Sequence, residues 1–230
     1  MASILDLSEK YCLVTGASRG IGRAIALDLA AAGATVAINY ATKEVAANAV
    51  MQDIINSGGR AITVQADTSD KNQVNQLFKK ILSDFGKLDI LINNAGVVSY
   101  VDFLDMSEEE WDRVININLK GYFLCGQQAA RIMAGNNTGR IVNISSISQV
   151  IPGVKRVHYC AAKGGVNMLT KGMALELARY NITVNAVAPG ATHTDFTKDV
   201  LSDPEFYQAV VNKIPLSRIG QPADITGAVL

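Results

Sequence analysis

Three residues, Ser146, Tyr159 and Lys163, have the types and the spacing needed to move a proton. Tyr159 and Lys163 are four residues apart, and of the seven tyrosines only Tyr159 has a lysine at this distance. On a helix this spacing places both side chains on one face, one turn apart. A phenol normally loses its proton near pH ~10, and a neighbouring ammonium lowers that pKa by favouring the phenolate. The pair therefore predicts a tyrosine general acid/base, with Ser146 as a nearby hydroxyl.

Six short apolar runs alternate with longer amphipathic segments and define the expected architecture. An example is the segment after residue 70, where Val74, Leu77, Phe78 and Ile81 follow the stripe of a half-buried helix. Apolar strands joined by helical crossovers predict an α/β fold, a doubly wound parallel sheet of the Rossmann type with helices on both faces. The strands are expected at Tyr11–Thr15, Thr35–Asn39, Ala61–Ala66, Ile90–Asn93, Arg140–Ile144 and Thr183–Ala188.

Two further signals mark helix starts, and the end of the chain is unusual. Ser107 with Glu110 has the spacing of a capping box that opens a long helix, and Pro222 suits the first turn of the last helix. The chain stops at Leu230, inside what reads as a helix, so the closing strand of such a sheet is expected to be missing.

Composition places the chain among enzyme-like domains. The 230 residues are 49% hydrophobic and 18% charged, and Lys+Arg and Asp+Glu both total 21. Such a length suits one domain over residues 1–230, and the balanced charge argues against a nucleic-acid or membrane partner. The three isolated cysteines predict reduced thiols and a cytoplasmic protein. No cluster of His, Cys, Asp or Glu has metal-ligand spacing, so no metal is expected.

A glycine-rich turn follows the first expected strand and leads into a helix. Glycines at such a turn let the backbone approach a pyrophosphate, whose charge is favoured by the helix N-terminus. The spacing here is G-x-x-x-G-x-G, and its strand–turn–helix context supports a dinucleotide site. The cofactor-binding residues predicted in this turn are Gly16, Ser18, Arg19, Gly20, Ile21 and Gly22.

The end of the second strand predicts which dinucleotide is preferred. NAD-binding versions of this site usually place an acidic residue there, whereas this chain has Asn39 and Tyr40. Arg19 lies in the nearby turn, and a guanidinium without an opposing carboxylate suits a 2′-phosphate. We therefore expect NADP to be preferred, with NAD as the alternative.

The residues named so far, together with several further motifs, resemble the short-chain dehydrogenase/reductases. The resemblance covers essentially all 230 residues, and its motifs occur in the family's order. The motifs are Thr15–Gly22, Asn93-Asn94-Ala95-Gly96, Asn118, Ser146, Tyr159 with Lys163, and Pro189-Gly190.

The resemblance implies a role for each catalytic residue. Tyr159 would exchange a proton with the substrate oxygen while hydride moves to or from the nicotinamide. Lys163 would hold the nicotinamide ribose and lower the pKa of the tyrosine, and Ser146 would hydrogen-bond the same substrate oxygen. Asn118, in the long fourth helix, would hold a water in a proton relay with Lys163. An asparagine within a helix is, by itself, more often a buried structural residue.

The resemblance also extends the cofactor site beyond the glycine turn. Asp67 and Thr68 would contact adenine, and the segment after the fourth strand would line the adenosine side. The loop after the sixth strand would embrace the nicotinamide and pyrophosphate, although Thr192 stands where the family usually has Ile or Val. The remaining predicted cofactor residues are Asn94, Ala95, Gly96, Pro189, Gly190, Thr192 and Thr194, together with Tyr159 and Lys163.

The substrate is left open by the residues. The chain is most similar to glucose 1-dehydrogenases, which implies a sugar, polyol or small ketone, and next to 3-oxoacyl-(acyl-carrier-protein) reductases. Those reductases often carry carrier-docking arginines, at positions where this chain has Asn137 and Tyr180. Arg131, Arg140, Lys171 and Arg179 are close by in the sequence. A rival of another class is an NADP-sensing regulatory protein that does not turn over.

The resemblance also implies an assembly. The fifth helix, which carries Tyr159, is rich in alanine and glycine, so close packing of helices is expected there. In the family the fourth and fifth helices form a homodimer or homotetramer. Of the two histidines, His158 is expected to be structural and His193 to face solvent.

Overall fold

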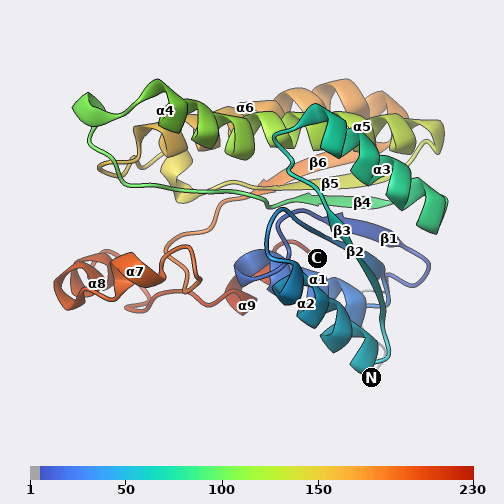
Figure 1. Cartoon of the computed structure of the whole chain (residues 1–230), viewed down its shortest axis with the longest axis horizontal. Coiled ribbons are helices and arrows are strands. Elements are labelled where there is room, and N and C mark those ends of the chain that lie inside the picture. The colour runs from blue at the N-terminus through green and yellow to red at the C-terminus, as the bar shows by residue number, and fades with distance from the viewer. Residues whose placement is uncertain (1–5) are drawn as a thin grey trace.

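The computed structural model describes residues 6–230 and places a parallel sheet at the centre of the molecule (Figure 1). Its six strands run in the order β3-β2-β1-β4-β5-β6. This confirms the predicted doubly wound sheet. The strands are β1 (Tyr11–Val14), β2 (Thr35–Tyr40), β3 (Arg60–Gln65), β4 (Ile90–Asn93), β5 (Gly139–Ile144) and β6 (Ile182–Val187).

Helices cover both faces of the sheet (Figure 1). On one face lie α1 (Gly20–Ala31), α2 (Glu44–Asn56) and α9 (Ala223–Thr226). On the other lie α3 (Lys71–Phe85), α4 (Glu108–Ile115), α5 (Gly121–Gly135) and α6 (Val157–Leu177). Two short helices, α7 (Lys198–Leu201) and α8 (Pro204–Val211), lie to one side.

Two hydrophobic cores result, because successive strand residues point to opposite faces. Leu13 of β1 joins Phe78, Leu91 and Met133 in the core beneath α3 and α5. The next residue, Val14, joins the core formed with α1 and α2. Covering both faces explains why the central strands are nearly continuous apolar runs.

The predicted fourth helix is not one regular helix. A π-helical turn, η2 (Asn116–Lys120), separates α4 from α5. Ser107 accepts a hydrogen bond from the Glu110 N–H at 3.2 Å, as a capping residue should. The reciprocal half of the predicted capping box does not form, because the Glu110 carboxylate bonds Arg113 and Ser99 instead.

The C-terminal segment corrects one prediction. Pro222 occupies the N-cap position of α9, close to its predicted place, but α9 ends at Thr226 and Leu230 lies beyond it. Within residues 6–230, β6 is an edge strand of the sheet and no seventh strand is present. No helix in this part of the chain has the length and apolar character needed to cross a membrane.

Candidate active site

The glycine turn after β1 presents unpaired backbone donors at the start of α1. Across the described residues, the N–H groups of Ser18, Arg19, Gly20 and Ile21 have no hydrogen-bond partner, and the N-cap of α1 receives no side-chain bond. Because the first N–H groups of a helix need acceptors from outside it, this end of a twelve-residue helix is built for an anion. The turn therefore fits the pyrophosphate of a dinucleotide.

The glycines of this turn are required by close contacts. Gly16 has φ +62°, and a Cβ there would lie 2.8 Å from Cα of Ala95. A Cβ on Gly22 would lie 2.4 Å from Nδ2 of Asn94. Asn94 in turn donates to the carbonyls of Thr15 at 2.9 Å and Gly16 at 3.1 Å. The loops after β1 and β4, both predicted for the cofactor, are thus joined.

The side chain of Asn39, predicted to contact the cofactor, forms its hydrogen bonds with the protein backbone. It is 1% exposed, its Oδ1 accepts from the Gly16 N–H at 3.3 Å, and its Nδ2 donates to the carbonyls of Val64 and Ala66. Asn39 therefore positions the glycine turn. The neighbouring Tyr40 is also buried, at the end of the same strand.

Asp67 and Thr68 follow β3 at the same edge of the sheet. Asp67 Oδ1 accepts from both the N–H and the hydroxyl of Ser69, which fixes this turn. Thr68 is buried. Both lie where carboxyl ends of parallel strands gather, the usual ligand edge of such sheets.

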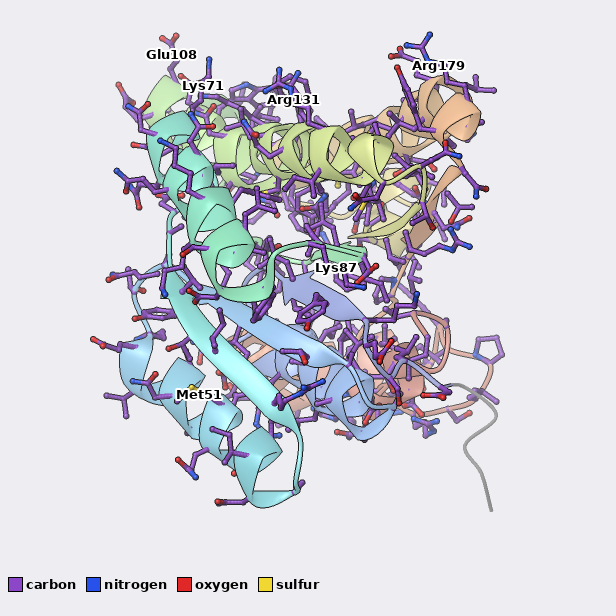
Figure 2. All side chains as sticks on the ribbon, turned by 90° about the vertical axis from the view of Figure 1, so that its right-hand side faces the viewer. Met51, Lys71, Lys87, Glu108, Arg131 and Arg179 are labelled. Atoms are coloured by element: carbon purple, nitrogen blue, oxygen red, sulfur yellow. The ribbon has the colours of Figure 1, made fainter. Side chains whose placement is uncertain are left out.

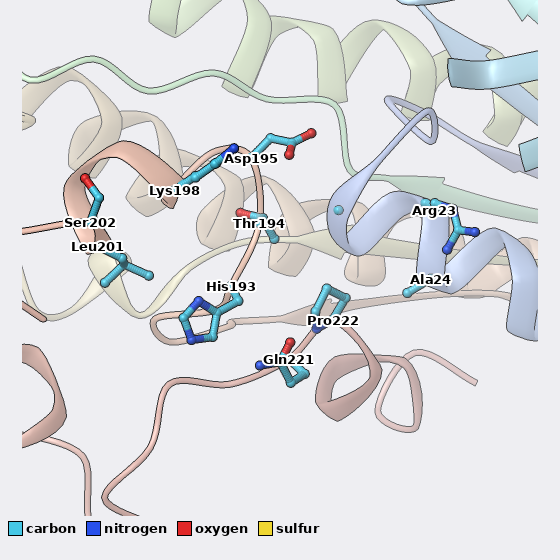
Figure 3. Close-up of a pocket in the computed structure, with 11 residues that line it drawn as sticks. Arg23, Ala24, His193, Thr194, Asp195, Lys198, Leu201, Ser202, Gln221 and Pro222 are labelled. Atoms are coloured by element: carbon cyan, nitrogen blue, oxygen red, sulfur yellow. The ribbon is translucent and has the colours of Figure 1, made fainter. Parts of the chain in front are cut away.

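The loop after β6 closes over the glycine turn. A Cβ on Gly20 would lie 3.4 Å from Cγ2 of Thr194. The first turn of α1 and residues 193–202 border a cleft of about 530 Å³, in which Thr194 and Asp195 face Arg23 and Ala24 (Figure 3). Thr192 is buried, and its hydroxyl donates to the Gly190 carbonyl at 3.1 Å.

Arg19 corrects the prediction of a guanidinium without an opposing carboxylate. Its Nη1 lies 3.5 Å from Oδ2 of Asp195, although both side chains are about half exposed. The sequence could not show this contact, because the two residues are far apart in the chain. An exposed ion pair of this kind contributes little stability, so an incoming phosphate can compete for the arginine.

Ser146 and Tyr159 come together as predicted. Ser146 directly follows β5 and is the N-cap of η3 (Ile147–Gln149). The Ile147 N–H donates to the Pro189 carbonyl at 3.0 Å, which ties this segment to the cofactor loop. Burial raises the pKa of Tyr159 above the ordinary value of a phenol, and the Ser146 hydroxyl beside it opposes that rise. The phenol therefore stays protonated at neutral pH, as a proton donor requires.

Lys163 lies one turn from Tyr159 but does not lower its pKa in this structure. Its Nζ is 5.7 Å from the centre of the Tyr159 ring and bonds the Tyr122 hydroxyl and the Ile144 carbonyl. Burial lowers the pKa of Lys163 to about 7, so the ammonium is only partly charged at neutral pH. The predicted effect of the lysine on the phenol is therefore absent here, because burial dominates both groups.

Asn118 lies in the π turn and is fully buried. Its Nδ2 donates to the carbonyls of Val97 at 2.8 Å and Val114 at 2.9 Å, and its Oδ1 accepts from the Val97 N–H at 3.3 Å. A side-chain amide that bonds the carbonyl four residues back competes with the helical ladder, which suits an interrupted helix. The side chain is bonded to the protein, and the water-holding role of Asn118 stays a prediction.

His158 joins a polar cluster that the sequence did not reveal. The ring is buried, and its Nε2 lies 2.8 Å from the Ser99 hydroxyl, which also contacts Glu110. Arg113 and Ser99 hold the pKa of Glu110 down to about 2. The predicted structural role of His158 is confirmed. His193 does not simply face solvent, because it is partly buried and stacks on Tyr207 with ring centres 6.2 Å apart.

Tyr122 is a site residue that the sequence analysis did not identify. It is 1% exposed, and its hydroxyl contacts both the Ile144 carbonyl and Lys163. The only available signal was a tyrosine four residues after Asn118 on the same helical segment. Among residues 6–230 no group of three or more His, Cys, Asp or Glu is arranged to hold a metal ion.

The fold and the site define a dinucleotide-binding α/β oxidoreductase with a serine, tyrosine and lysine at the carboxyl edge of the sheet. The family model described as short chain dehydrogenase matches residues 10–205. The chain therefore belongs to the short-chain dehydrogenases, as the resemblance implied, and is an oxidoreductase that acts on CH–OH groups with a nicotinamide dinucleotide.

Individual relatives agree with this assignment. The chain is 44% identical over 223 residues to a 3-oxoacyl-[acyl-carrier-protein] reductase of Synechocystis, covering 97% of this chain and 88% of the relative. It is 46% identical over 220 residues to the reductase of that name from Staphylococcus aureus, covering 96% and 89%. A structure from Beutenbergia cavernae, described as an NAD(P)-dependent gluconate 5-dehydrogenase with bound NADP, superposes with a TM-score of 0.93 at 32% identity, covering 97% and 89%.

Proposed function

We propose that the chain reduces the ketone of a 3-oxoacyl thioester with NADPH, with Tyr159 as the proton donor. The bound cofactor supplies the hydride. Ser146 and Tyr159 bind the substrate oxygen, and Lys163 with Thr194 and the glycine turn holds the cofactor. The observation that carries this proposal is the protonated, buried Tyr159 beside Ser146, at the sheet edge that holds the unpaired N–H groups of α1.

Apolar side chains near Tyr159 favour the acyl substrate. Phe196 lies with its ring centre 6.0 Å from that of Tyr159 and is 41% exposed. In the segment that follows Ser146, Val150 is 70% exposed and Ile151 is 64% exposed. Exposed apolar groups at a site are stabilised when a ligand covers them, and an acyl chain supplies apolar surface where a sugar supplies hydroxyls. The two reductase relatives support the same choice.

Basic residues on the helical surface could bind an acidic carrier protein. Lys71, Arg131 and Arg179 project from the outer surface of the helical layer that contains α3, α5 and α6 (Figure 2). Lys171 is also exposed, on α6. An acidic carrier is attracted by such a surface, so these residues can serve in place of arginines at Asn137 and Tyr180.

The second candidate is oxidation of a sugar, polyol or small alcohol, as in glucose 1-dehydrogenases. The likeness to the structure described as a gluconate 5-dehydrogenase favours it. It differs from the first candidate in the ligand that must be bound, since a sugar needs several polar partners. The rival of another class, an NADP sensor, predicts cofactor binding without turnover.

Initial rates separate these candidates. Purified protein is given NADPH with an acetoacetyl thioester and, in parallel, NADP⁺ with D-glucose or gluconate. Fast thioester reduction without sugar oxidation supports the reductase, and the reverse supports the sugar dehydrogenase. Cofactor binding by fluorescence without turnover on either substrate, or on a panel of ketones, would favour the sensor. Tyr159→Phe is the matched inactive control.

The wider proposal concerns assembly and location. We propose one domain over residues 1–230, a cytoplasmic location and a homodimer or homotetramer formed through α5 and α6. Exposed Phe123, Met168 and Leu175 on these helices support the interface, since an association would cover them. Light scattering of the purified protein gives the oligomeric state directly.

A further inference from the structure

The Lys163 ammonium is hydrogen-bonded to α5 and to the end of β5. Its Nζ donates to the Ile144 carbonyl at 2.8 Å and to the Tyr122 hydroxyl at 3.2 Å. It also lies 4.8 Å from the centre of the Tyr122 ring, closer than to the ring of Tyr159 at 5.7 Å. The lysine that the proposed function needs is thus attached to α5 and to the end of β5.

The Tyr122 hydroxyl can act toward Lys163 only as an acceptor. It has one proton, which it donates to the Ile144 carbonyl at 2.9 Å. Burial keeps the pKa of Tyr122 well above that of a free phenol, so this proton is not lost at neutral pH. The remaining lone pair faces the lysine, and an acceptor stabilises an ammonium more than a neutral amine.

Within residues 6–230, no carboxylate forms an ion pair with Lys163. The groups that face its ammonium are Tyr122 from α5, the Ile144 carbonyl from β5 and Tyr159 from its own helix. Burial alone lowers the pKa of Lys163 to about 7, so each remaining acceptor matters for its charge at neutral pH.

We propose that Tyr122 is a positioning residue for Lys163, docking the ammonium against the Ile144 carbonyl and keeping it charged. The inference rests on the proposed function, in which Lys163 acts beside Tyr159. Ile144 lies two residues before Ser146, so the same bond links the lysine to the strand end that carries the serine. Tyr122, Lys163 and Ser146 are in this way fixed to one short piece of β5.

The first test measures Lys163 in the cofactor-free protein. Lysine labelled with ¹³C at Cε is titrated by NMR in the unchanged protein and in Tyr122→Phe, and Lys163→Met identifies the resonance. We expect the unchanged protein to titrate near pH 7. Loss of one hydrogen bond in Tyr122→Phe should lower this midpoint by roughly 0.5–1 pH unit. An unchanged Lys163 midpoint in the Tyr122→Phe protein would overturn the proposal.

The second test measures NADPH affinity and kcat. Tyr11→Phe is the matched control, because Tyr11 lies at the start of β1, at the end of the strand away from the glycine turn. At pH 8, Tyr122→Phe should weaken NADPH binding and lower kcat roughly three- to tenfold, with little effect at pH 6. In a Lys163→Met background the same substitution should leave NADPH affinity unchanged. Equal losses at both pH values, or in both backgrounds, would show a merely structural role.

The two proposals fail in different ways. If the unchanged protein turns over no substrate while its Lys163 still titrates near pH 7 and responds to Tyr122→Phe, the proposed function is wrong and the docking stands. If the protein is active and Tyr122→Phe behaves like Tyr11→Phe, the docking is wrong. Should Tyr122→Phe fail to fold, tyrosine labelled with ¹³C at Cζ is titrated in the unchanged protein, and a Tyr122 resonance that does not follow the titration of Lys163 would overturn the docking.

Discussion

The side chain of Asn118 makes two hydrogen bonds to the backbone of Val97, donating to its carbonyl at 2.8 Å and accepting from its N–H at 3.3 Å. These bonds join the π turn between α4 and α5 to the loop after β4, which carries Asn94 and Gly96. A Cβ on Gly96 would lie 2.7 Å from Oδ1 of Asn118, so the two segments fit tightly. Asn118, a predicted catalytic residue, therefore uses its side chain to hold the π turn against the loop after β4.

The first prediction concerns Asn118→Asp. A carboxylate keeps the acceptor toward the Val97 N–H but loses both donors, and it faces the carbonyls of Val97 and Val114 in a buried place. We expect a loss of about 2–4 kcal/mol in the free energy of unfolding, measured by urea titration. An unchanged midpoint would mean that the asparagine does not hold the loop.

The second prediction concerns Tyr159→Phe. Removing the hydroxyl removes the proton donor, so turnover should fall by at least about a thousandfold, while NADPH affinity stays within a few-fold. Steady-state kinetics and fluorescence titration measure the two quantities, with Tyr11→Phe as control. Turnover retained in the variant would refute the acid/base assignment.

The third prediction concerns Arg19→Ala. If the guanidinium leaves Asp195 to bind a 2′-phosphate, the variant should bind NADP roughly 10- to 100-fold less tightly and NAD almost unchanged. Arg60→Ala is the matched control, since Arg60 is exposed at the start of β3, the end of that strand away from the predicted cofactor site. Equal losses for the two cofactors would remove the case for NADP preference.

The fourth prediction concerns stability and pH at Lys163. Its pKa is lowered to about 7 in the folded protein, below that of an unfolded lysine, so the unfolded chain binds more protons between about pH 7 and 10. Stability should therefore rise with pH across this window and lose this contribution as pH falls through 7. Lys163→Met should be inactive, more stable at pH 7 and free of this slope. Thermal unfolding from pH 6 to 10 tests this, and parallel slopes would contradict it.

The fifth prediction concerns Asn39→Asp, the change that a search for NAD specificity would suggest. The new carboxylate would face the carbonyls of Val64 and Ala66 without a proton to donate. We expect destabilisation of about 2–4 kcal/mol, larger at pH 8 than at pH 5, and no gain in NAD affinity.

Asn48→Asp is the control for this fifth experiment. Among the described residues, the Asn48 side chain makes one hydrogen bond, which it accepts from the Thr63 hydroxyl at 3.0 Å, and a carboxylate accepts equally well. The control should therefore unfold like the unchanged protein. A stable Asn39→Asp protein that binds NAD more tightly would show that this side chain turns toward the cofactor.

Local patterns in the amino-acid sequence are enough to predict part of this fold and part of its site. Strand and helix positions follow from apolar periodicity, and all six strands begin within one residue of their prediction, with β3, β5 and β6 each starting one residue early. The glycine turn and the spacing of Tyr159 and Lys163 are equally local. A turn or a helix fixes the relation between residues that are near in the chain.

The partners of these residues follow from contacts between segments that are distant in the chain. Asp195 forms an ion pair with Arg19, and Tyr122 accepts a hydrogen bond from Lys163. Asn39 is buried and accepts a hydrogen bond from the Gly16 N–H. Each of these contacts joins separate elements of the fold. Their formation depends on packing and burial, and burial also set the pKa values of Tyr159 and Lys163 against the expectation from their spacing. Spacing along a helix determines which side chains share a face. Their pKa values also depend on burial, which the whole fold determines.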